Sequence, residues 1–390
     1  MAINVSQRGE IMKHYLIIGN GVAGTTAAET IRKNDPHGEI TLLAREHLPF
    51  YSRIRLPEYA AGKIPEDALI IKNLAWHESN RIRLYTNTQA TSIDFQKKQV
   101  MTAAGESFAW DKLLLATGSH SFIPPVQGSK KNRVFALRNV EDAQRLLELG
   151  DTVTDVVIIG GGLLGLEAGA HILDAGKKVT VVEFFNRLLP RQLDNEGSAK
   201  LQKLMETMGF SFRLEEATEA IIGNDDRVEA VKLKSGTILR ADAVLFATGV
   251  RSTLDLVAAS DIEADQGIIV NERMETNIAD VYAAGDVALF NGINYCIWPE
   301  AADQGRVAGI AMTGGDISYV GRPPSNKLKV AGIALASAGN IDTDNIHDNE
   351  IVSTKSVYKK LVRDDKGKLI GCIMIGDTKA FNTLVKKMGV

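Results

Sequence analysis

The chain has 390 residues, of which 45% are hydrophobic and 24% charged, as is typical of a globular protein with two or three domains. Its net charge of −3 excludes a general affinity for nucleic acid. No apolar run approaches the roughly 20 residues that cross a bilayer, and residues 1–12 are polar, so we expect a cytoplasmic enzyme that does not bind membranes. The two cysteines, Cys296 and Cys372, lie too far apart for a disulfide framework, a zinc site or a Cys-x-x-Cys pair.

Residues 13–46 have the pattern of a unit that binds a dinucleotide. Its parts are a strand at 15–18, the turn Gly19-Asn20-Gly21-Val22-Ala23-Gly24, a helix that Pro36 ends, a strand at 40–43 and the acid Glu46. Gly19 suits the tight turn, Gly21 lets a pyrophosphate approach the backbone, and Gly24 lets the helix pack on the strand. The helix N-terminus offers N–H groups to the phosphates, and Glu46 can accept from ribose hydroxyls.

The next stretch combines a loop with short strands. Residues 48–59 are rich in proline and aromatic residues, which predicts a loop with packed side chains, and Arg53 and Arg55 in it could bind phosphates. Residues 113–116 form a buried strand that Thr117-Gly118 closes. Three strand-like pieces precede it, at residues 81–85, 91–95 and 99–102.

A second copy of the opening pattern occupies residues 156–183. Its parts are a strand at 156–159, the turn Gly160-Gly161-Gly162-Leu163-Leu164-Gly165, a helix at 166–175, a strand at 178–182 and Glu183. Two units predict two bound dinucleotides, or a duplication in which one site was lost. The intact turn and acid in both copies favour two functional sites.

Glu183 also bears on the choice of nicotinamide nucleotide. A carboxylate at this position binds a ribose 2′-OH and repels a 2′-phosphate. Phe184 and Phe185 follow it, where a phosphate-binding enzyme needs arginine, but Arg187 is close enough to keep NADPH as an alternative. The sequence therefore favours NADH over NADPH.

The second unit is followed by a helix predicted at residues 201–208 and a small antiparallel sheet. The strands of that sheet are predicted at residues 210–213, 228–233 and 237–240. Residues 243–249 repeat the apolar run plus Thr-Gly that is seen at residues 113–118.

A strand that ends in Gly285-Asp286 places a carboxylate at the C-terminal edge of a strand, where α/β folds bind ligands. Trp298-Pro299-Glu300 then opens a helix that runs through Ala301 to Met312, since proline suits the first turn of a helix.

The chain changes in character from Tyr319 onward. Strands are predicted at residues 327–335, 352–362 and 368–375, and a helix at residues 378–388. This tail has twelve Lys and Arg against seven Asp and Glu, a net charge of +5, which leaves −8 for the rest of the chain. The asymmetry predicts a docking face for an acidic partner, with a solvated surface as the alternative.

The order of the two glycine turns, the two Thr-Gly pairs and the Gly-Asp pair resembles the two-dinucleotide flavoproteins, also called pyridine nucleotide-disulfide oxidoreductases. The resemblance covers residues 13–318 and implies an α/β fold with two Rossmann-like, glutathione-reductase-like dinucleotide-binding domains and a small α+β C-terminal domain. The implied domains are an FAD-binding domain at 1–118 and 243–318, an NAD(P)H-binding domain at 119–242 and an interface domain at 319–390.

The resemblance also implies the residues of each site. FAD would be held by Gly19, Gly21, Val22, Ala23, Gly24, Glu46, Arg53, Ala116, Thr117, Gly118, Gly285, Asp286, Trp298, Glu300 and Ala301. NADH would be held by Gly160, Gly162, Leu163, Leu164, Gly165, Glu183 and Gly249. Among the FAD residues, Asp286 would bind the ribityl chain, and the helix that opens at Trp298 would direct its N-terminus at the flavin pyrimidine.

The chain departs from the family in its cysteines. Members that relay electrons through thiols have a cysteine pair or a single cysteine after the first unit, whereas this chain has none before Cys296. Electrons must therefore leave the flavin directly.

The match is closest to NADH:rubredoxin reductases and to the FAD- and NADH-binding front part of nitrite reductase large subunits, with which the chain shares Arg53, Arg55 and Leu56. Two cysteines cannot hold a four-cysteine cluster, so we do not expect this chain to reduce nitrite by itself.

The sequence thus predicts an FAD-dependent NADH oxidoreductase that passes electrons to a small acidic redox protein such as rubredoxin, and no metal site. One alternative is an enzyme that reduces oxygen or a quinone. Another is an electron-entry subunit of a larger reductase, or a redox-sensing flavoprotein that recruits a partner. The oligomeric state is not predicted.

Glu58 and Glu167 are the predicted catalytic residues. Related ferredoxin reductases place a lysine from the loop after the first unit against a glutamate on the helix of the second unit. Here the helix residue is Glu167 and the loop position is Glu58, so the ion pair would become a carboxyl pair. If the two side chains meet, the pKa of one of them should be raised; the alternative is that Glu58 faces solvent.

Overall fold

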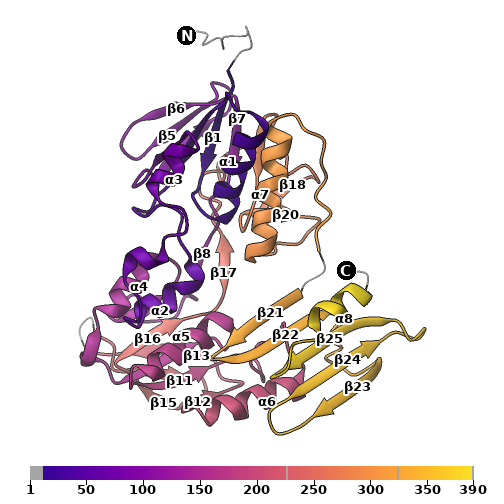
Figure 1. Ribbon diagram of the computed structural model, residues 1–390. Coiled ribbons are helices and arrows are strands. Elements are labelled where there is room, and N and C mark those ends of the chain that lie inside the picture. Colours follow the sequence, from indigo (N-terminus) through magenta and orange to yellow (C-terminus); the bar gives the residue numbers. More distant parts are fainter. Residues whose placement is uncertain (1–11, 225–226, 323–324, 389–390) are drawn as a thin grey trace. The chain divides into compact units, whose positions relative to one another are not determined.

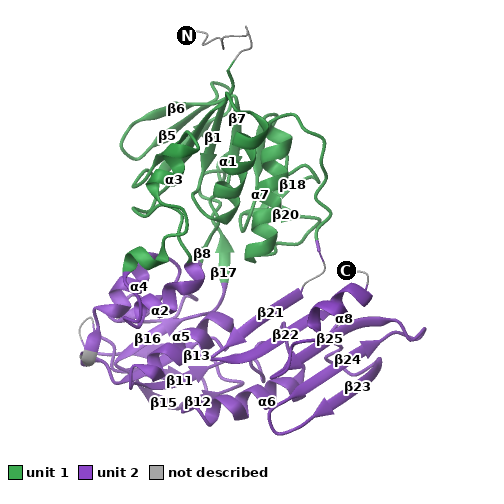
Figure 2. Ribbon diagram, in the orientation of Figure 1, with its two compact units in different colours: residues 1–52, 66–120, 250–321 green, residues 53–65, 121–249, 322–390 purple. Residues whose placement is uncertain are grey.

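The computed structural model describes residues 12–224, 227–322 and 325–388, with its helices and strands labelled in Figure 1. The chain divides into two compact units (Figure 2). Unit 1 comprises residues 1–52, 66–120 and 250–321, and unit 2 comprises residues 53–65, 121–249 and 322–390. No helix in the described ranges combines the length and apolar character that a bilayer crossing requires.

Unit 1 is built on a parallel sheet with the strand order β19-β7-β1-β2-β3. Leu16 and Ile17 in the central strand β1 are fully buried, as expected for a strand that is covered on both faces. The strands are β1 (His14–Ile18), β2 (Glu39–Leu43), β3 (Ile82–Tyr85), β7 (Lys112–Leu115) and β19 (Val281–Ala283).

Two helices of unit 1, α1 (Val22–Asn34) and α7 (Trp298–Met312), pack against each other. Their backbones approach closely at Gly305, where a Cβ would lie 2.3 Å from the carbonyl oxygen of Ala23. Only glycine permits this approach, so the two helices form one support beside the sheet.

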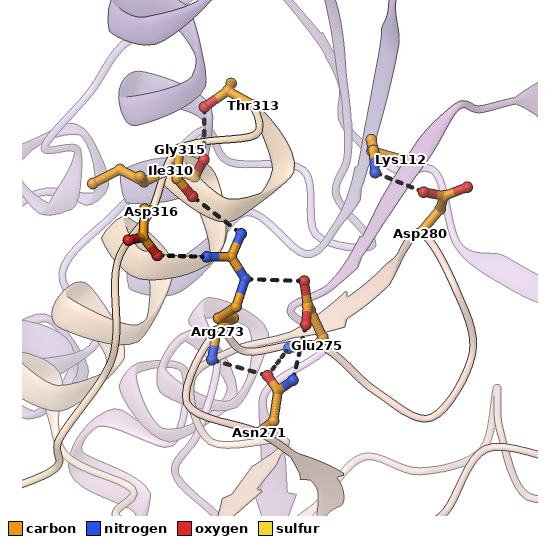
Figure 3. Close-up of polar contacts among 9 residues, drawn as sticks. All are labelled: Lys112, Asn271, Arg273, Glu275, Asp280, Ile310, Thr313, Gly315 and Asp316. Carbon is orange, nitrogen blue, oxygen red and sulfur yellow. Dashed lines mark hydrogen bonds and ion pairs between the residues drawn. The ribbon is translucent and has the colours of Figure 1, made fainter.

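Arg273 fixes the C-terminal end of α7 (Figure 3). Its guanidinium donates to the carbonyl of Gly315 at 3.0 Å and contacts Glu275 at 3.3 Å and Asp316 at 3.4 Å. The chain just before β19 is thereby tied to the chain just after α7.

The remaining elements of unit 1 are shorter. They are the 3₁₀ turn η2 (Glu66–Leu69), α3 (Leu74–Ser79), the antiparallel strands β4 (Ala90–Asp94), β5 (Gln99–Thr102) and β6 (Ser107–Ala109), and the parallel pair β18 (Ile268–Val270) and β20 (Ala288–Phe290). The strands β8 (Ser119–Ser121) and β17 (Val250–Ser252) lie where the chain passes from one unit to the other.

Unit 2 contains a second parallel sheet, with the order β12-β11-β10-β16-β9. Its strands are β9 (Val134–Ala136), β10 (Asp155–Ile159), β11 (Lys178–Val182), β12 (Phe210–Arg213) and β16 (Ala243–Phe246). The helical segments are η1 (Arg53–Arg55), α2 (Leu56–Ala60), α4 (Val140–Leu147), η3 (Gly150–Thr152), α5 (Leu163–Asp174) and α6 (Asn195–Glu206). A small antiparallel sheet is made of β13 (Thr218–Ile222), β14 (Ala230–Leu233) and β15 (Ile238–Arg240).

The C-terminal part of unit 2 is an antiparallel sheet with the order β21-β22-β25-β24-β23. Its elements are β21 (Ser325–Val330), β22 (Ile333–Gly339), β23 (Asp348–Ser353), β24 (Tyr358–Arg363), β25 (Leu369–Ile375) and the helix α8 (Phe381–Met388). One face packs under α8 through a cluster that includes Ala336, Cys372 and Phe381. α6 packs against β24 and β25 of the same sheet.

The mixed α/β class and both glycine-turn units are confirmed, but three predicted elements are wrong. Residues 327–335 and 352–362 are each two strands joined by a turn, because short turns interrupt the apolar runs. Residues 210–213 pair in parallel with β11 instead of joining the small antiparallel sheet. Their alternating burial indicates a strand but cannot reveal its partner.

Two further differences concern the limits of the domains. Residues 53–65 belong to unit 2. Within them, residues 56–60 form a helix where a loop was expected, and Pro57 lies in its first turn. β16 pairs with β10, so residues 243–249 lie in the second sheet and unit 1 resumes only at residue 250, later than the predicted FAD domain.

Candidate active site

The turn between β1 and α1 requires its glycines for two different reasons. Gly19 has a φ of +116°, and a Cβ there would lie 2.0 Å from the carbonyl oxygen of Ala116. A Cβ on Gly24 would lie 1.9 Å from the carbonyl oxygen of Gly19. A Cβ on Gly21, in contrast, would meet no atom within 4 Å. The fold needs Gly19 and Gly24, whereas Gly21 keeps open the space through which a ligand approaches.

The helix α1 begins at this open position. Gly21 is its N-cap and provides no side-chain cap, and the first turn, which starts with Val22 and Ala23, has no acidic residue. Such an N-terminus presents N–H groups and a partial positive charge, which suits a phosphate.

Glu46 lies just after β2, at the edge of the sheet where the strands end. The hydroxyl of Tyr51 donates to its Oε2 at 2.5 Å. This bond fixes the carboxylate near the glycine turn, where the sequence predicts a contact with ribose.

Asp286 lies at the same edge, three residues after β19. The hydroxyl of Ser119 donates to its Oδ2 at 2.7 Å. The neighbouring Gly285 has a φ of +83°, and its N–H donates to Oε1 of Gln304 on α7 at 2.8 Å. The loop that carries Asp286 is thus held by both β8 and α7.

The N-terminus of α7 has no side-chain cap, since its N-cap is Ile297. Trp298 packs against Phe50, with the ring centroids 5.8 Å apart. Glu300 and Ala301 are buried, and the carboxylate of Glu300 accepts a hydrogen bond from the hydroxyl of Tyr319. Burial and this carboxylate together raise the pKa of Tyr319.

The second glycine turn repeats the geometry of the first. Gly160 has a φ of +113°, and a Cβ there would lie 2.4 Å from the carbonyl oxygen of Ala247. A Cβ on Gly165 would lie 2.5 Å from the carbonyl oxygen of Gly160, whereas one on Gly162 would have its nearest atom at 3.9 Å. The helix α5 begins here with Leu163 and Leu164, again without a side-chain cap or an acid in its first turn.

The two Thr-Gly pairs have matching roles in the two units. Thr117 donates its hydroxyl to the carbonyl of Thr253 at 2.9 Å, and Thr248 donates to the carbonyl of Phe122. Gly118 and Gly249 follow with φ values of +70° and +94°. Each pair follows a strand beside a glycine turn. The two units are therefore alike in these hydrogen bonds as well as in their glycine turns.

Glu183 is buried beside the second turn. Its Oε2 accepts from the N–H of Gly161 at 2.5 Å, and its Oε1 accepts from the N–H of Phe185 at 2.9 Å. Both donors hold the carboxylate against the turn. A negative charge at this place fits a ribose hydroxyl and repels a 2′-phosphate.

The residues after Glu183 do not offer a phosphate site. Phe184 and Phe185 are exposed and make an edge-to-face pair with the centroids 5.5 Å apart. The guanidinium of Arg187 donates to the carbonyl of Pro190 at 3.3 Å and to the side chain of Asn186 at 3.4 Å. The geometry therefore favours NADH, as the sequence does.

Arg53, predicted to bind FAD, lies in unit 2 and donates to the carbonyl of Arg138 at 2.5 Å. Arg55 contacts Glu58 at 3.1 Å, one turn further along the same segment. These contacts do not test the predicted roles of Arg53 and Glu58.

Glu167 is half-buried on α5, two residues after Gly165. Its Oε1 accepts from the N–H of Ala331, at the turn between β21 and β22, at 3.0 Å. Burial raises the pKa of Glu167 and the charge of Glu58 raises it further, whereas the Ala331 N–H and the charge of Lys329 lower it. Glu58 is thus close enough to act on Glu167, but no hydrogen bond joins the two carboxylates within the described ranges.

Several residues of these sites were not predicted from the sequence. Tyr51, Ser119 and Gln304 hold predicted residues in place, and Lys329 and Ala331 act on Glu167. Tyr51 lies five residues from Glu46, so its proximity could have been noticed. The others are distant in sequence, and no local pattern indicates them.

Two glycine turns that open onto uncapped helix N-termini, each with an acid at the end of the next strand, define a protein that binds two dinucleotides. The comparisons give the family. The chain matches the pyridine nucleotide-disulphide oxidoreductase family over residues 13–305 and belongs to it. Residues 324–389 match the rubredoxin NAD⁺ reductase C-terminal domain.

Two curated relatives and one solved structure illustrate the similarity. The chain is 36% identical over 378 residues to a nitrite reductase [NAD(P)H] of Bacillus subtilis, covering 95% of this chain but 46% of that protein. It therefore spans about half the length of that relative. It is 34% identical over 374 residues to an NADH-rubredoxin oxidoreductase of Clostridium acetobutylicum, covering 95% and 93%. The crystal structure of NADH:rubredoxin oxidoreductase from that organism matches with a TM-score of 0.83 at 31% identity, covering 97% and 95%.

The family makes the chain an oxidoreductase that uses FAD and NADH. The residues present fit both cofactors. Gly21 and Gly162 leave space above two helix N-termini, and Glu46 and Glu183 stand at the ends of the adjacent strands. Neither Cys296 nor Cys372 forms a disulfide, and the thiol of Cys372 is buried, which raises its pKa to about 11.

Proposed function

We propose that the protein oxidises NADH and passes the electrons to a small acidic redox protein of the rubredoxin type. One observation carries this proposal. The similarity to the Clostridium NADH-rubredoxin oxidoreductase extends over nearly the full length of both chains and includes the C-terminal domain. A cytoplasmic location is part of the same proposal.

FAD, when bound, supplies the redox chemistry, because a flavin accepts two electrons from NADH and can release them singly. The residues of unit 1 bind and orient FAD. The N–H groups at the start of α1 hold its phosphates, while Glu46 and Asp286 accept from its hydroxyls. The N-terminus of α7 places a partial positive charge beside the ring system.

Unit 2 binds NADH through the N-terminus of α5 and through Glu183. Glu167, on the next turn of α5, is the acid proposed to face the nicotinamide, and Glu58 acts on its charge. Burial raises the pKa of the half-buried Glu167 carboxyl, as is common for groups that take part in proton transfer.

No thiol relay takes part in this proposal. The chain has no cysteine before Cys296, which lies in the loop before α7. The acceptor must therefore approach the bound flavin itself.

The test compares acceptors directly. The enzyme is reduced with NADH under anaerobic conditions and mixed with rubredoxin, ferredoxin, a quinone or oxygen, and flavin reoxidation is followed by stopped-flow absorbance. The proposal expects rubredoxin to be the fastest acceptor. Faster oxidation by oxygen or by the quinone would contradict it and support an NADH oxidase or quinone reductase.

A second candidate is an NADH-oxidising component of a larger reductase. It is favoured by the B. subtilis nitrite reductase, whose sequence this chain matches over only 46% of its length. If reoxidation is slow with every small acceptor, but the protein co-purifies with a larger reductase and reduces it, this candidate replaces the first.

A further inference from the structure

The turn between β21 and β22 brings the C-terminal sheet to the helix of the NADH unit. β21 contacts α5, and Figure 1 shows the β21–β22 hairpin reaching that helix. Ala331 and Gly332 form a two-residue turn with φ values of +48° and +84°, since Val330 pairs with Ile333. Positive φ at both positions is typical of a type I′ turn. This geometry aims the N–H of Ala331 at Glu167, which accepts it at 3.0 Å.

The strand before the turn carries two exposed lysines on one face. Lys327 lies opposite Ala336, and Lys329 lies opposite Ala334. Directly opposed residues share a face, so both lysines lie on the face that α8 covers. Only Lys329, two residues before Ala331, acts on the charge of Glu167.

A residue of α2 has the opposite effect on the charge of Glu167. Glu58 repels the charge of Glu167 and is itself paired with Arg55 at 3.1 Å. One turn further along α5, His171 has a pKa lowered by burial, and the charges of Lys63 and Glu58 reach it as well. The charge of Glu167 is therefore opposed by an acid on α2 and favoured by an amide and a lysine on the C-terminal hairpin.

We propose that the β21–β22 hairpin is part of the NADH site, with the amide of Ala331 orienting the carboxylate of Glu167 and Lys329 adding a positive charge on the strand beside it. Lys329 is then a positioning residue that the C-terminal domain contributes to NADH oxidation. The contact of the hairpin with Glu167 does not depend on which protein accepts the electrons. Its consequence for catalysis rests on the proposed function.

The first test measures Glu167 itself. The FAD-loaded enzyme is labelled with ¹³C at the glutamate carboxyl carbon, and the Glu167 resonance is identified by its loss in Glu167→Gln. Its titration is then followed against pH. Removing the positive charge in Lys329→Gln should move the midpoint to higher pH, and removing the negative charge in Glu58→Gln should move it to lower pH.

Lys327→Gln is the matched control, because it removes an equal charge from the same strand and face two residues away. Its Glu167 midpoint should stay at the wild-type value. The ring resonances of His171 are followed in the same samples and report that residue separately. Equal midpoints in Lys329→Gln and Lys327→Gln would overturn the proposal.

The second test is the rate of flavin reduction by NADH against pH, measured by stopped-flow in the same variants. The kinetic midpoint should shift in the same direction as the Glu167 resonance in Lys329→Gln and in Glu58→Gln. A shifted resonance with an unshifted kinetic midpoint would overturn the role of Glu167 in NADH oxidation while supporting the contact of the hairpin. An unshifted resonance with rapid rubredoxin reduction would overturn the effect of the hairpin on Glu167 and leave the proposed function standing.

Discussion

Glu183 sets the nucleotide preference by its position and by the two bonds that hold it. Its oxygens accept from the N–H groups of Gly161 and Phe185, so the negative charge stays beside the turn where the ribose binds. We expect wild-type enzyme to be reduced much faster by NADH than by NADPH. The double variant Glu183→Ser with Phe184→Arg should narrow this ratio, as measured by kcat/KM for the two nucleotides.

The single variant Phe184→Arg is the control, because it adds the positive charge and keeps the carboxylate. It should retain most of the preference for NADH. Loss of Glu183 also leaves the buried N–H of Gly161 and the N–H of Phe185 without their acceptor, so the double variant should be less stable by about 1–3 kcal/mol in urea unfolding. A wild-type enzyme that prefers NADPH would contradict the assignment of Glu183.

Two glycines of the first turn have different roles, one in folding and one in ligand binding. A Cβ at Gly24 meets the Gly19 carbonyl oxygen at 1.9 Å, so Gly24→Ala should destabilise unit 1 by more than about 3 kcal/mol. A Cβ at Gly21 meets no atom within 4 Å, so Gly21→Ala should fold normally but retain little FAD. Thermal unfolding and the flavin absorbance of the purified proteins measure the two effects. Full FAD content in Gly21→Ala would show that the phosphates do not approach there.

At the scale of elements, the C-terminal sheet is joined to α6 by a buried ion pair. Lys360 is fully buried, and its Nζ lies 3.1 Å from Oδ2 of Asp194 and 2.7 Å from the carbonyl of Asp342. Asp194 is the N-cap of α6, where it accepts from the N–H of Gly197 at 2.9 Å. Removal of the lysine leaves a buried carboxylate without its counter-charge.

Lys360→Met should therefore cost about 3–5 kcal/mol of unfolding free energy. The neighbouring Lys359→Met is the control, because residue 359 lies on the opposite face of β24 and is only partly buried. It should change stability by less than about 0.5 kcal/mol. Chemical denaturation of both variants measures the difference, and equal midpoints would show that the ion pair adds nothing to stability.

The same elements show what could be predicted from the sequence. The glycine turns were located because a strand, three glycines, a helix and an acid follow one another within about 30 residues. The hairpin at Ala331-Gly332 was missed, since an alanine at the first turn position lacks the Asn-Gly or Asp-Gly pattern that usually reveals such a turn. The neighbour of Glu167 was also missed, because Ala331 lies 164 residues away in the chain. Local order is visible in a sequence, whereas contacts between distant segments require the fold.

At the scale of the molecule, charge is distributed unevenly along the chain. Residues from Tyr319 onward carry a net charge of +5, whereas the whole chain carries −3. Lys327 and Lys329 lie on the face of the C-terminal sheet that α8 covers, and Lys386 and Lys387 are exposed in the last turn of α8. We propose that these four lysines contribute to one basic face that an acidic acceptor recognises.

Attraction between this face and an acidic acceptor should depend on salt. The Debye length falls from about 30 Å at 0.01 M ionic strength to about 8 Å at 0.15 M, so the bimolecular rate of rubredoxin reduction should fall steeply across that range. The double variant Lys386→Gln with Lys387→Gln should be slower at low salt and less sensitive to salt. α8, which carries these two lysines, packs on β25 and β22, so flavin reduction by NADH serves as the internal control and should keep its wild-type rate. If rubredoxin reduction is equally fast at both ionic strengths, and equally fast in the variant, the lysine face is only a solvated surface and the acceptor docks elsewhere.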